Sequence, residues 1–253
     1  MQAEITELMS NVTTIEIGRV AGLFRYPVKS MLGASLESVA LGWHGFAGDR
    51  RFAFRRMTDK VGFPWLNANR LPVLSLYQPI LQGDVPTHVL TPDGATLEIY
   101  SEELRQELSA RFGKEVEMLQ IDRGIFDEAT VSVISTSTIR GLAQTLEKEI
   151  DERRFRPNIL LETTQTEIFG EDEWVGGTLI FGEEDLGPAV SITLRDLRCN
   201  TINLNPDTAQ QDPSVLKAVG QLNKGNAGVY GTVVRTGTLA VGQKVWLHRT
   251  TEK

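Results

Sequence analysis

The chain has 253 residues, 41% of them hydrophobic and 23% charged, which is ordinary for a globular protein and far from a disordered composition. Lysine and arginine number 26 against 33 aspartate and glutamate residues, so the net charge is −7. Because nucleic acids and anionic membranes bind basic surfaces, this balance argues against both as partners, but it allows a small basic pocket for one phosphate. At about 150 residues per domain, the length predicts one large domain or two smaller ones.

The single cysteine, Cys199, excludes an internal disulfide, and the sequence shows no secretory signal pattern. The longest apolar runs, such as residues 131–134, are far shorter than the roughly 20 residues of a membrane helix. We therefore expect a soluble, cytoplasmic protein that does not bind a membrane. The histidines His44, His88 and His248 are widely spaced, which argues against a histidine-based zinc or iron site.

The first half of the chain has the pattern of short strands. Residues 15–28, 34–41 and 50–57 alternate apolar and polar side chains and are separated by glycines, as in barrels and meanders. The β pattern continues in the stretch VLSLYQPIL at residues 73–81. Residues 87–100 carry a Pro-Asp-Gly turn between two alternating runs, which predicts a β-hairpin.

Helical patterns begin at Ser101, where a capping signal precedes a helix over residues 101–113, and a second helix is predicted over 137–150. We place a domain boundary between about residues 108 and 125. The remaining predicted elements are strands at 155–161, 175–181, 191–196 and 230–236, a helix near 213–222, and a last hairpin at 238–247. Phosphate-binding glycine loops and nucleophile elbows are not found.

Two segments of the first half combine residues that a core does not require. In the YPVKS segment, Lys29 and Ser30 place an ammonium beside a hydroxyl, which suits a phosphate clamp, although taken alone such a segment is more often a solvated turn. In the second segment, Asp49 precedes Arg50 and Arg51. This aspartate either fixes the direction of a guanidinium or forms an ordinary surface ion pair.

Two further segments lie in the second half. Arg156 and Asn158 stand at the entrance to the apolar run 159–161, where they need partners that either a cofactor or protein carboxylates could supply. Cys199 follows Arg198, which favours the thiolate, the form that binds a soft metal. The alternative for a lone cysteine is a small buried hydrophobe.

Together these segments resemble the MOSC proteins, named after the C-terminal domain of molybdenum-cofactor sulfurase. The likeness is to the two-part subgroup of the mitochondrial amidoxime-reducing components and their bacterial relatives. The YPVKS-like turn, the DR-F segment, the RFRPN strand and the RC…PDT segment all occur in the family's order, and the resemblance spans about residues 15–247. It implies a β-rich α+β fold, with an N-terminal MOSC-type β-barrel domain at residues 15–115 followed by a mixed β-barrel and helix MOSC domain at 116–253.

The resemblance also implies a molybdenum–pterin cofactor (Mo-molybdopterin) between the two parts, with Cys199 as the catalytic residue and metal ligand. It further implies molybdenum-ion and pyridoxal phosphate binding. Asp127 matches a position near the opening above the metal. The cofactor-binding positions that the resemblance carries over are Lys29, Ser30, Arg50, Ser135, Arg156, Asn158 and Arg198.

The activity implied is reduction of small N-hydroxylated compounds, namely hydroxylamines, amidoximes and N-hydroxylated bases. With one cysteine the chain carries no iron–sulfur centre. Neither the ferredoxin-like domain nor the membrane anchor of some relatives is found in the sequence. We therefore expect electrons from a separate donor protein, ferredoxin- or cytochrome b5-like.

The segment after Cys199 departs from the family, because Ile202 and Asn203 replace two threonines and Ala209 replaces a glycine, which puts the turn geometry and the substrate-side hydrogen bonds in question. Two alternatives therefore stay open. One is a molybdenum-cofactor or sulfur carrier that binds without redox turnover, with a persulfide on Cys199. The other is a structural or interaction protein that has lost the chemistry.

Overall fold

The computed structural model describes residues 12–58 and 63–250. A barrel of seven strands closes in the order β11-β10-β14-β13-β12-β16-β1, with β1 pairing back to β11. Within this barrel β10 and β11 run parallel, and the other neighbouring strands are antiparallel. The barrel strands are β1 Val12–Arg25, β10 Val131–Ser135, β11 Ile159–Thr163, β12 Thr178–Phe181, β13 Ala189–Leu197, β14 Asn226–Arg235 and β16 Lys244–Thr250.

The barrel interior follows from the period-two patterns of the sequence, since alternate side chains of a strand point to the same face. Val131 and Val133 of β10, and Ile159 and Leu161 of β11, are fully buried in one core cluster. The long strand β1 bends so that its first part pairs with β16 and its second with β11. Gly18 lies at this bend with φ +151°, where an added Cβ would stand 2.0 Å from the Glu162 carbonyl oxygen, so only glycine fits.

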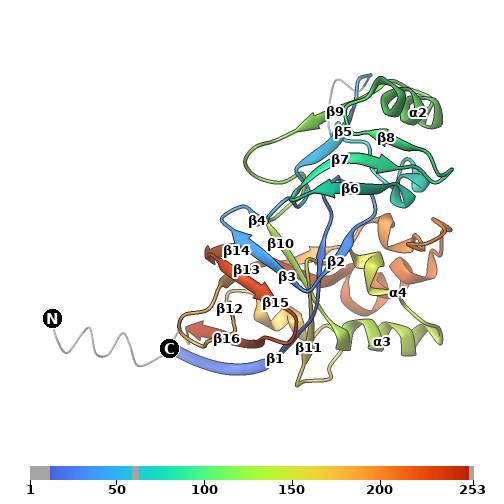
Figure 1. Cartoon of the computed structure of the whole chain (residues 1–253). Coiled ribbons are helices and arrows are strands. Elements are labelled where there is room, and N and C mark those ends of the chain that lie inside the picture. Colours follow the sequence, from blue (N-terminus) through green and yellow to red (C-terminus); the bar gives the residue numbers. More distant parts are fainter. Residues whose placement is uncertain (1–11, 59–62, 251–253) are drawn as a thin grey trace.

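A second layer lies above the barrel in Figure 1 and carries its own core, which includes Phe52, Tyr77 and Leu104. It combines a two-stranded sheet, β5–β9, with the three-stranded sheet β6-β7-β8. The predicted Pro-Asp-Gly hairpin is the β7–β8 pair. The elements of this layer are β5 Phe52–Arg56, β6 Gln78–Gln82, β7 Val85–Leu90, β8 Thr96–Glu98, α2 Glu102–Phe112 and β9 Val116–Gln120.

The described residues form three α-helices, and all three were predicted. In α2 the Ser101 hydroxyl accepts the Leu104 N–H, and Gly113 ends the helix in the left-handed conformation, as the capping signals require. Helices α3 Thr136–Leu146 and α4 Ser214–Asn223 pack against each other beside the barrel, at the lower right of Figure 1. None of the described helices has the length and apolar character needed to cross a membrane.

Two local predictions are wrong. Residues 238–247 do not form a hairpin, because β15 Gly237–Ala240 pairs with β3 Ser38–Gly42, in a small sheet with β4 Gly45–Phe46, while β16 joins the barrel. Residues Pro72–Leu76 form a 3-10 helix instead of a strand, since the proline sets a helical φ at its start. The short strand β2 Ala34–Leu36 pairs with β1 and adds an eighth strand to the sheet that forms the barrel.

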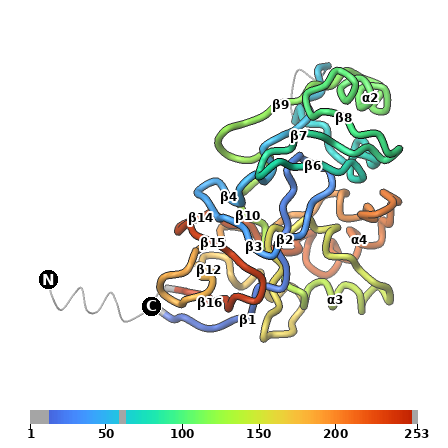
Figure 2. Tube along the Cα trace, viewed as in Figure 1, coloured from blue at the N-terminus to red at the C-terminus, as the bar shows by residue number. Residues whose placement is uncertain are grey.

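The sheets join segments that are far apart in the sequence. Figure 2 shows β1, from the start of the described chain, beside β16 from its end. Likewise β15 pairs with β3. The β-rich α+β class is therefore confirmed, whereas the division into residues 15–115 and 116–253 stays a prediction.

Candidate cofactor site

A cavity of about 380 Å³ opens where the connecting segments of the two layers meet. These segments follow β1, precede β5, β10 and β11, and follow β13. Six of the eight predicted site residues line it: Lys29, Ser30, Arg50, Arg156, Arg198 and Cys199. Asp127 also lines the cavity. The fold thus brings together positions that are separated by as much as two thirds of the chain.

Three residues of the cavity wall have left-handed backbones, which non-glycine residues adopt at a cost of order 1–3 kcal/mol. They are Ser30 (φ 64°), Arg50 (φ 46°) and Arg156 (φ 50°). Backbone hydrogen bonds hold two of them, from Arg50 N–H to the Tyr26 carbonyl at 2.8 Å and from Arg156 N–H to the Arg153 carbonyl at 3.1 Å. Strain of this kind concentrates at binding sites, where the surrounding structure enforces one side-chain direction.

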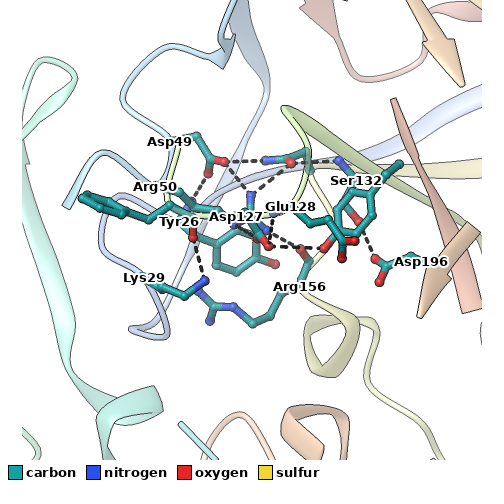
Figure 3. Close-up of polar contacts among 12 residues, drawn as sticks. Tyr26, Lys29, Asp49, Arg50, Asp127, Glu128, Ser132, Arg156 and Asp196 are labelled. Atoms are coloured by element: carbon teal, nitrogen blue, oxygen red, sulfur yellow. Dashed lines mark hydrogen bonds and ion pairs between the residues drawn. The ribbon is translucent and has the colours of Figure 1, made fainter. Parts of the chain in front are cut away.

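A buried carboxylate organises the wall beneath the cavity (Figure 3). Asp49 is fully buried and accepts three hydrogen bonds, from the Tyr26 N–H at 2.7 Å, the Arg50 Nη1 at 2.5 Å and the Asn158 Nδ2 at 3.1 Å. The Arg50 Nε contacts Asp127 at 2.8 Å, and its Nη1 also donates to Asn158 Oδ1 at 3.1 Å. Asn158 therefore lies behind the cavity wall, and most donors of Arg50 serve the protein itself.

Arg156 differs from Arg50 because part of its guanidinium lacks a partner. Its Nη1 donates to the Met31 carbonyl at 2.7 Å, and its plane stacks 4.2 Å from the Tyr26 ring centre. Its Nη2 is buried with no hydrogen-bond acceptor among the described residues. Burial lowers the pKa of Arg156 to about 10. A bound anion would supply the missing acceptor.

Lys29 brings a second cation to the same wall. Its Nζ donates to the Phe126 carbonyl at 2.6 Å. Desolvation lowers the pKa of Lys29, Asp127 opposes this shift, and Arg50 adds to it. Crowded, partly desolvated cations of this kind are stabilised by an anionic ligand.

Cys199 follows β13 and is exposed at the cavity, so the alternative of a buried hydrophobe is wrong. Its thiol donates to Thr201 Oγ1 at 3.3 Å. Partial desolvation raises the pKa of the thiol, but hydrogen bonds with Thr201 and Asn69 and the charge of Arg198 outweigh it, so the net shift is downward. Thiolate is therefore favoured where a soft metal would bind.

Arg198 is fixed by the protein on three sides. Its Nε donates to the Ala227 carbonyl at 2.6 Å, its Nη1 donates to the Phe155 carbonyl at 2.8 Å, and its Nη2 lies 2.8 Å from Asp196. It therefore contributes charge beside Cys199 and fixes the direction of the cysteine segment.

The charges of the wall suit an anionic ligand. Five cationic side chains and three acidic ones line the cavity, in a chain whose net charge is −7. With the unpaired Arg156 donor and the exposed thiol, this set fits a group that carries a phosphate and a soft metal. The cationic residues are Lys29, Arg50, Arg154, Arg156 and Arg198, and the acidic ones are Asp127, Glu128 and Asp196.

Several lining residues were not singled out from the sequence. Tyr230, from β14, donates to Asp127 Oδ1 at 3.4 Å. Asn69 comes from the upper layer and accepts the Thr201 hydroxyl at 2.8 Å, which connects that layer to the cysteine segment. Asn69 lies in no motif, whereas Tyr230 belongs to the Tyr230-Gly231 segment of the family resemblance, from which no site role was carried over.

Ser135 is the predicted residue that the fold places elsewhere. It caps the N-terminus of α3 and, with Thr138, donates to Glu171 Oε2 at 2.7 Å from each hydroxyl. This buried cluster lines a separate small cavity beside Thr163. Ser135 therefore has a capping role here and does not line the cavity of Cys199.

Glu171 provides a pH-dependent test of this cluster. Burial raises its pKa, although the hydroxyls of Ser135 and Thr138 oppose the shift. A raised folded pKa means that its contribution to stability is complete below the unfolded value of about 4.3 and is lost as pH rises through the folded pKa. Glu171→Gln should remove this loss, so that its free energy of unfolding falls less with rising pH than that of the wild type. Denaturant titrations from pH 4 to 9 measure the slope.

The matched control is Glu173→Gln, an exposed position of the same short 3-10 helix. In the Glu173→Gln protein, the free energy of unfolding should change with pH as it does in the wild type. A Glu171→Gln protein with an unchanged slope would contradict the assignment of a buried titrating carboxyl.

The segment after Cys199 keeps its turn despite the loss of glycine. Ala209 takes φ 55°, the left-handed conformation that glycine adopts freely. Its N–H donates to the Asn205 carbonyl at 2.8 Å. Arg153 binds Asp207 with two hydrogen bonds of 2.9 Å each. The left-handed turn is therefore formed even with alanine at position 209.

Ala209→Gly should raise the free energy of unfolding by up to about 1 kcal/mol, because it relieves the left-handed alanine while adding some unfolded-state entropy. Guanidinium denaturation measures the change. Ala110→Gly, at an exposed position of α2, is the control of opposite sign and should cost about 1 kcal/mol. A loss of stability in Ala209→Gly would show that the turn is not strained.

Comparison with known proteins supports the fold and the family. A family model described as "MOSC domain" matches residues 86–246, and one described as "MOSC N-terminal beta barrel domain" matches residues 17–129. No curated protein matches the sequence.

Among solved structures, the chain is similar to the YUAD protein from Bacillus subtilis, with 13% identity, a TM-score of 0.53, and coverage of 95% of this chain and 100% of that one. It is also similar to YiiM from Geobacillus stearothermophilus, with 16% identity, a TM-score of 0.37, and coverage of 47% and 54%. The first likeness supports the fold alone. Because both family models match and the β-rich barrel fold is present, the chain belongs to the MOSC family, which is associated with molybdenum-cofactor binding.

Proposed function

We propose that this protein is a molybdenum-cofactor-dependent oxidoreductase that reduces hydroxylamines, amidoximes or N-hydroxylated bases with electrons from a separate donor protein. One observation carries the proposal. The exposed thiol of Cys199, with its lowered pKa, opens on a cavity that the cationic side chains of Lys29 and Arg156 also line. Thiolate and cations are the two donor types that a molybdenum–pterin cofactor requires.

Different residues of the cavity would bind different parts of the cofactor. Cys199 would bind the metal, and Lys29, Ser30 and Arg156 would bind the anionic end of the cofactor. The bound cofactor supplies the two-electron redox chemistry. Arg50 and Asn158 hold the wall from behind, as do the contacts of Arg198 beside the cysteine; Ser135, which caps α3, is not part of this proposal.

Reduction of R–NH–OH to R–NH2 and water consumes two electrons and two protons, so the cavity needs a proton donor. Asp196 lines it, and burial raises the pKa of this carboxyl to about 6, although Arg198 opposes the shift. We infer that its carboxyl group holds a proton in mildly acidic solution and can deliver it towards the cavity. Tyr230, whose pKa burial raises, stays protonated beside it.

Electrons would enter where the cavity opens. Leu197 and Phe63 line the cavity and are 66% and 54% exposed, beside the exposed Cys199. A ferredoxin- or cytochrome b5-like donor docking over this opening would approach the metal through little protein. A reducing, cytoplasmic setting suits the proposal, because Cys199 must remain a free thiol.

The second candidate is a carrier of the cofactor, or of sulfur as a persulfide on Cys199, without redox turnover. The exposure and lowered pKa of this thiol favour it, since both also promote persulfide chemistry. Pyridoxal phosphate binding has narrower support in the same cavity, from the lowered pKa of Lys29, which makes its amine more nucleophilic.

The protein purified from a cofactor-competent host should contain about one molybdenum per chain. It should also reduce a hydroxylamine with an artificial electron donor. Molybdenum without turnover, combined with cofactor or sulfur transfer to an apo-enzyme, would favour the carrier. Absence of both cofactor and transfer would leave the structural or interaction protein.

A further inference from the structure

A second, smaller cavity shares Arg154 and Arg156 with the cavity of Cys199. It measures about 40 Å³, against about 380 Å³ for the cavity of Cys199. Arg154, Arg156 and Thr201 line both cavities, whereas Tyr26 lines only the smaller one. At about 10–15 Å³ per water molecule, the smaller cavity has room for roughly three waters or one small polyatomic ion, and is too small for a pterin.

Three residues that line this cavity carry buried hydrogen-bond donors without a partner in the described part of the chain. Tyr26 is 2% exposed, and its hydroxyl has no hydrogen-bond partner among the described residues. The same holds for the buried Nε of Arg154 and the Nη2 of Arg156. A buried donor left unpaired costs about 1–3 kcal/mol, and more when charged, so three of them at one cavity indicate a missing acceptor.

The donors have the protonation states that an anion requires. Burial raises the pKa of Tyr26 to about 12, so the phenol keeps its proton at neutral pH. Arg156 remains charged there although burial lowers its pKa to about 10. The Tyr26 ring is itself held between two guanidinium groups, with Arg156 at 4.2 Å and Arg50 at 4.9 Å from its centre (Figure 3).

Other charges do not supply the acceptor. Arg153 also lines the cavity, but Asp151 and Asp207 already bind its guanidinium. No aspartate or glutamate is among the described residues that line the cavity. The remaining polar groups at its edge are hydroxyls, such as that of Ser75, which already donates to the Pro72 carbonyl.

We propose that the cavity behind Tyr26 is a binding site for a small oxyanion of the phosphate class, which accepts hydrogen bonds from Tyr26 Oη, Arg154 Nε and Arg156 Nη2. This site shares Arg156 with the proposed cofactor clamp, but Lys29 and Ser30 of that clamp line only the other cavity. It requires no redox activity and therefore does not depend on the proposed function. The oxyanion is either a free anion or the phosphate group of a larger ligand that reaches past Arg156.

Phosphate binding to the cofactor-free full chain tests the proposal by calorimetry, at constant ionic strength against chloride. Tyr26→Phe removes one hydroxyl donor and keeps the stacked ring, so it should weaken phosphate binding about 10-fold, the value of one hydrogen bond to a charged group. Tyr100→Phe, at an exposed tyrosine whose hydroxyl binds Gln120, is the matched control and should bind as the wild type. Lys29→Met should leave phosphate binding at the Tyr26 cavity intact.

Crystals of the wild type soaked in tungstate give an independent readout that needs no variant. We expect an anomalous peak beside Tyr26 Oη in the cofactor-free protein. In the loaded protein, a persistent peak identifies a free anion, and its replacement by density continuous with the cofactor identifies a phosphate group of that ligand; both support the site. Tungstate confined to the Cys199 cavity, or wild-type phosphate affinity in Tyr26→Phe, would overturn it.

Discussion

Cys199→Ala should abolish reduction of N-hydroxylated substrates, because it removes the one thiolate that the cavity offers to a soft metal. The fold should persist, since the side chain is exposed and exposed substitutions usually change stability by no more than about 0.5 kcal/mol. Turnover, molybdenum content and thermal unfolding are measured on the same preparation. Full activity in a metal-free Cys199→Ala protein would sink the proposed function.

Two companion measurements separate the role of the thiolate from that of the site's shape. Cys199→Ser keeps the size of the side chain but has no accessible anion, so it should be as inactive as the alanine variant. Thr201→Val removes the hydroxyl that lies 3.3 Å from Sγ and helps to lower the pKa of the thiol. The pH dependence of Cys199 alkylation in this variant should shift upwards, a readout that requires neither metal nor turnover.

Local signals predicted local structure well. The caps at Ser101 and Gly113 fixed both ends of α2, because each satisfies backbone groups within one turn of chain. The hairpin at residues 238–247 failed for the complementary reason. Its two strands alternate correctly, but β15 finds its partner in β3, about 200 residues away, and β16 is needed to close the barrel. Pairing between distant strands is not encoded in their own pattern.

The site was predicted through short motifs, and the structure shows what those motifs do not reveal. Lys29, Arg156 and Cys199 line one cavity as expected from the resemblance. A serine between a strand and a helix, such as Ser135, can either cap the helix or bind a ligand, and only the tertiary structure shows which role it has. Likewise, the sequence did not show whether Asp49 orients an arginine or forms a surface ion pair. The burial of Asp49 depends on segments that meet only in the folded protein.

Asp49→Ala should lower the free energy of unfolding by about 3–5 kcal/mol, the usual cost of removing one partner of a buried ion pair. Asp49 is fully buried and Arg50 is 4% exposed, so no water replaces the lost carboxylate. The variant also leaves the Tyr26 N–H and the Asn158 Nδ2 without this acceptor. Asp49 also fixes the Arg50 side chain, whose Nη2 donates to the Arg156 carbonyl at 2.9 Å, so cofactor affinity should fall together with stability.

Asp84→Ala is the matched control, since Asp84 also contacts an arginine, Arg25, at 2.5 Å but with a side chain that is 60% exposed. The two variants remove the same kind of ion pair and differ in its burial. Because an exposed ion pair contributes about 0–1 kcal/mol to stability, Asp84→Ala should cost no more than that. Urea denaturation of both proteins at neutral pH gives the comparison. Equal losses of stability would mean that Asp49 does not organise the wall of the cavity, and that Lys29 and Arg156 must be positioned by their backbone segments alone.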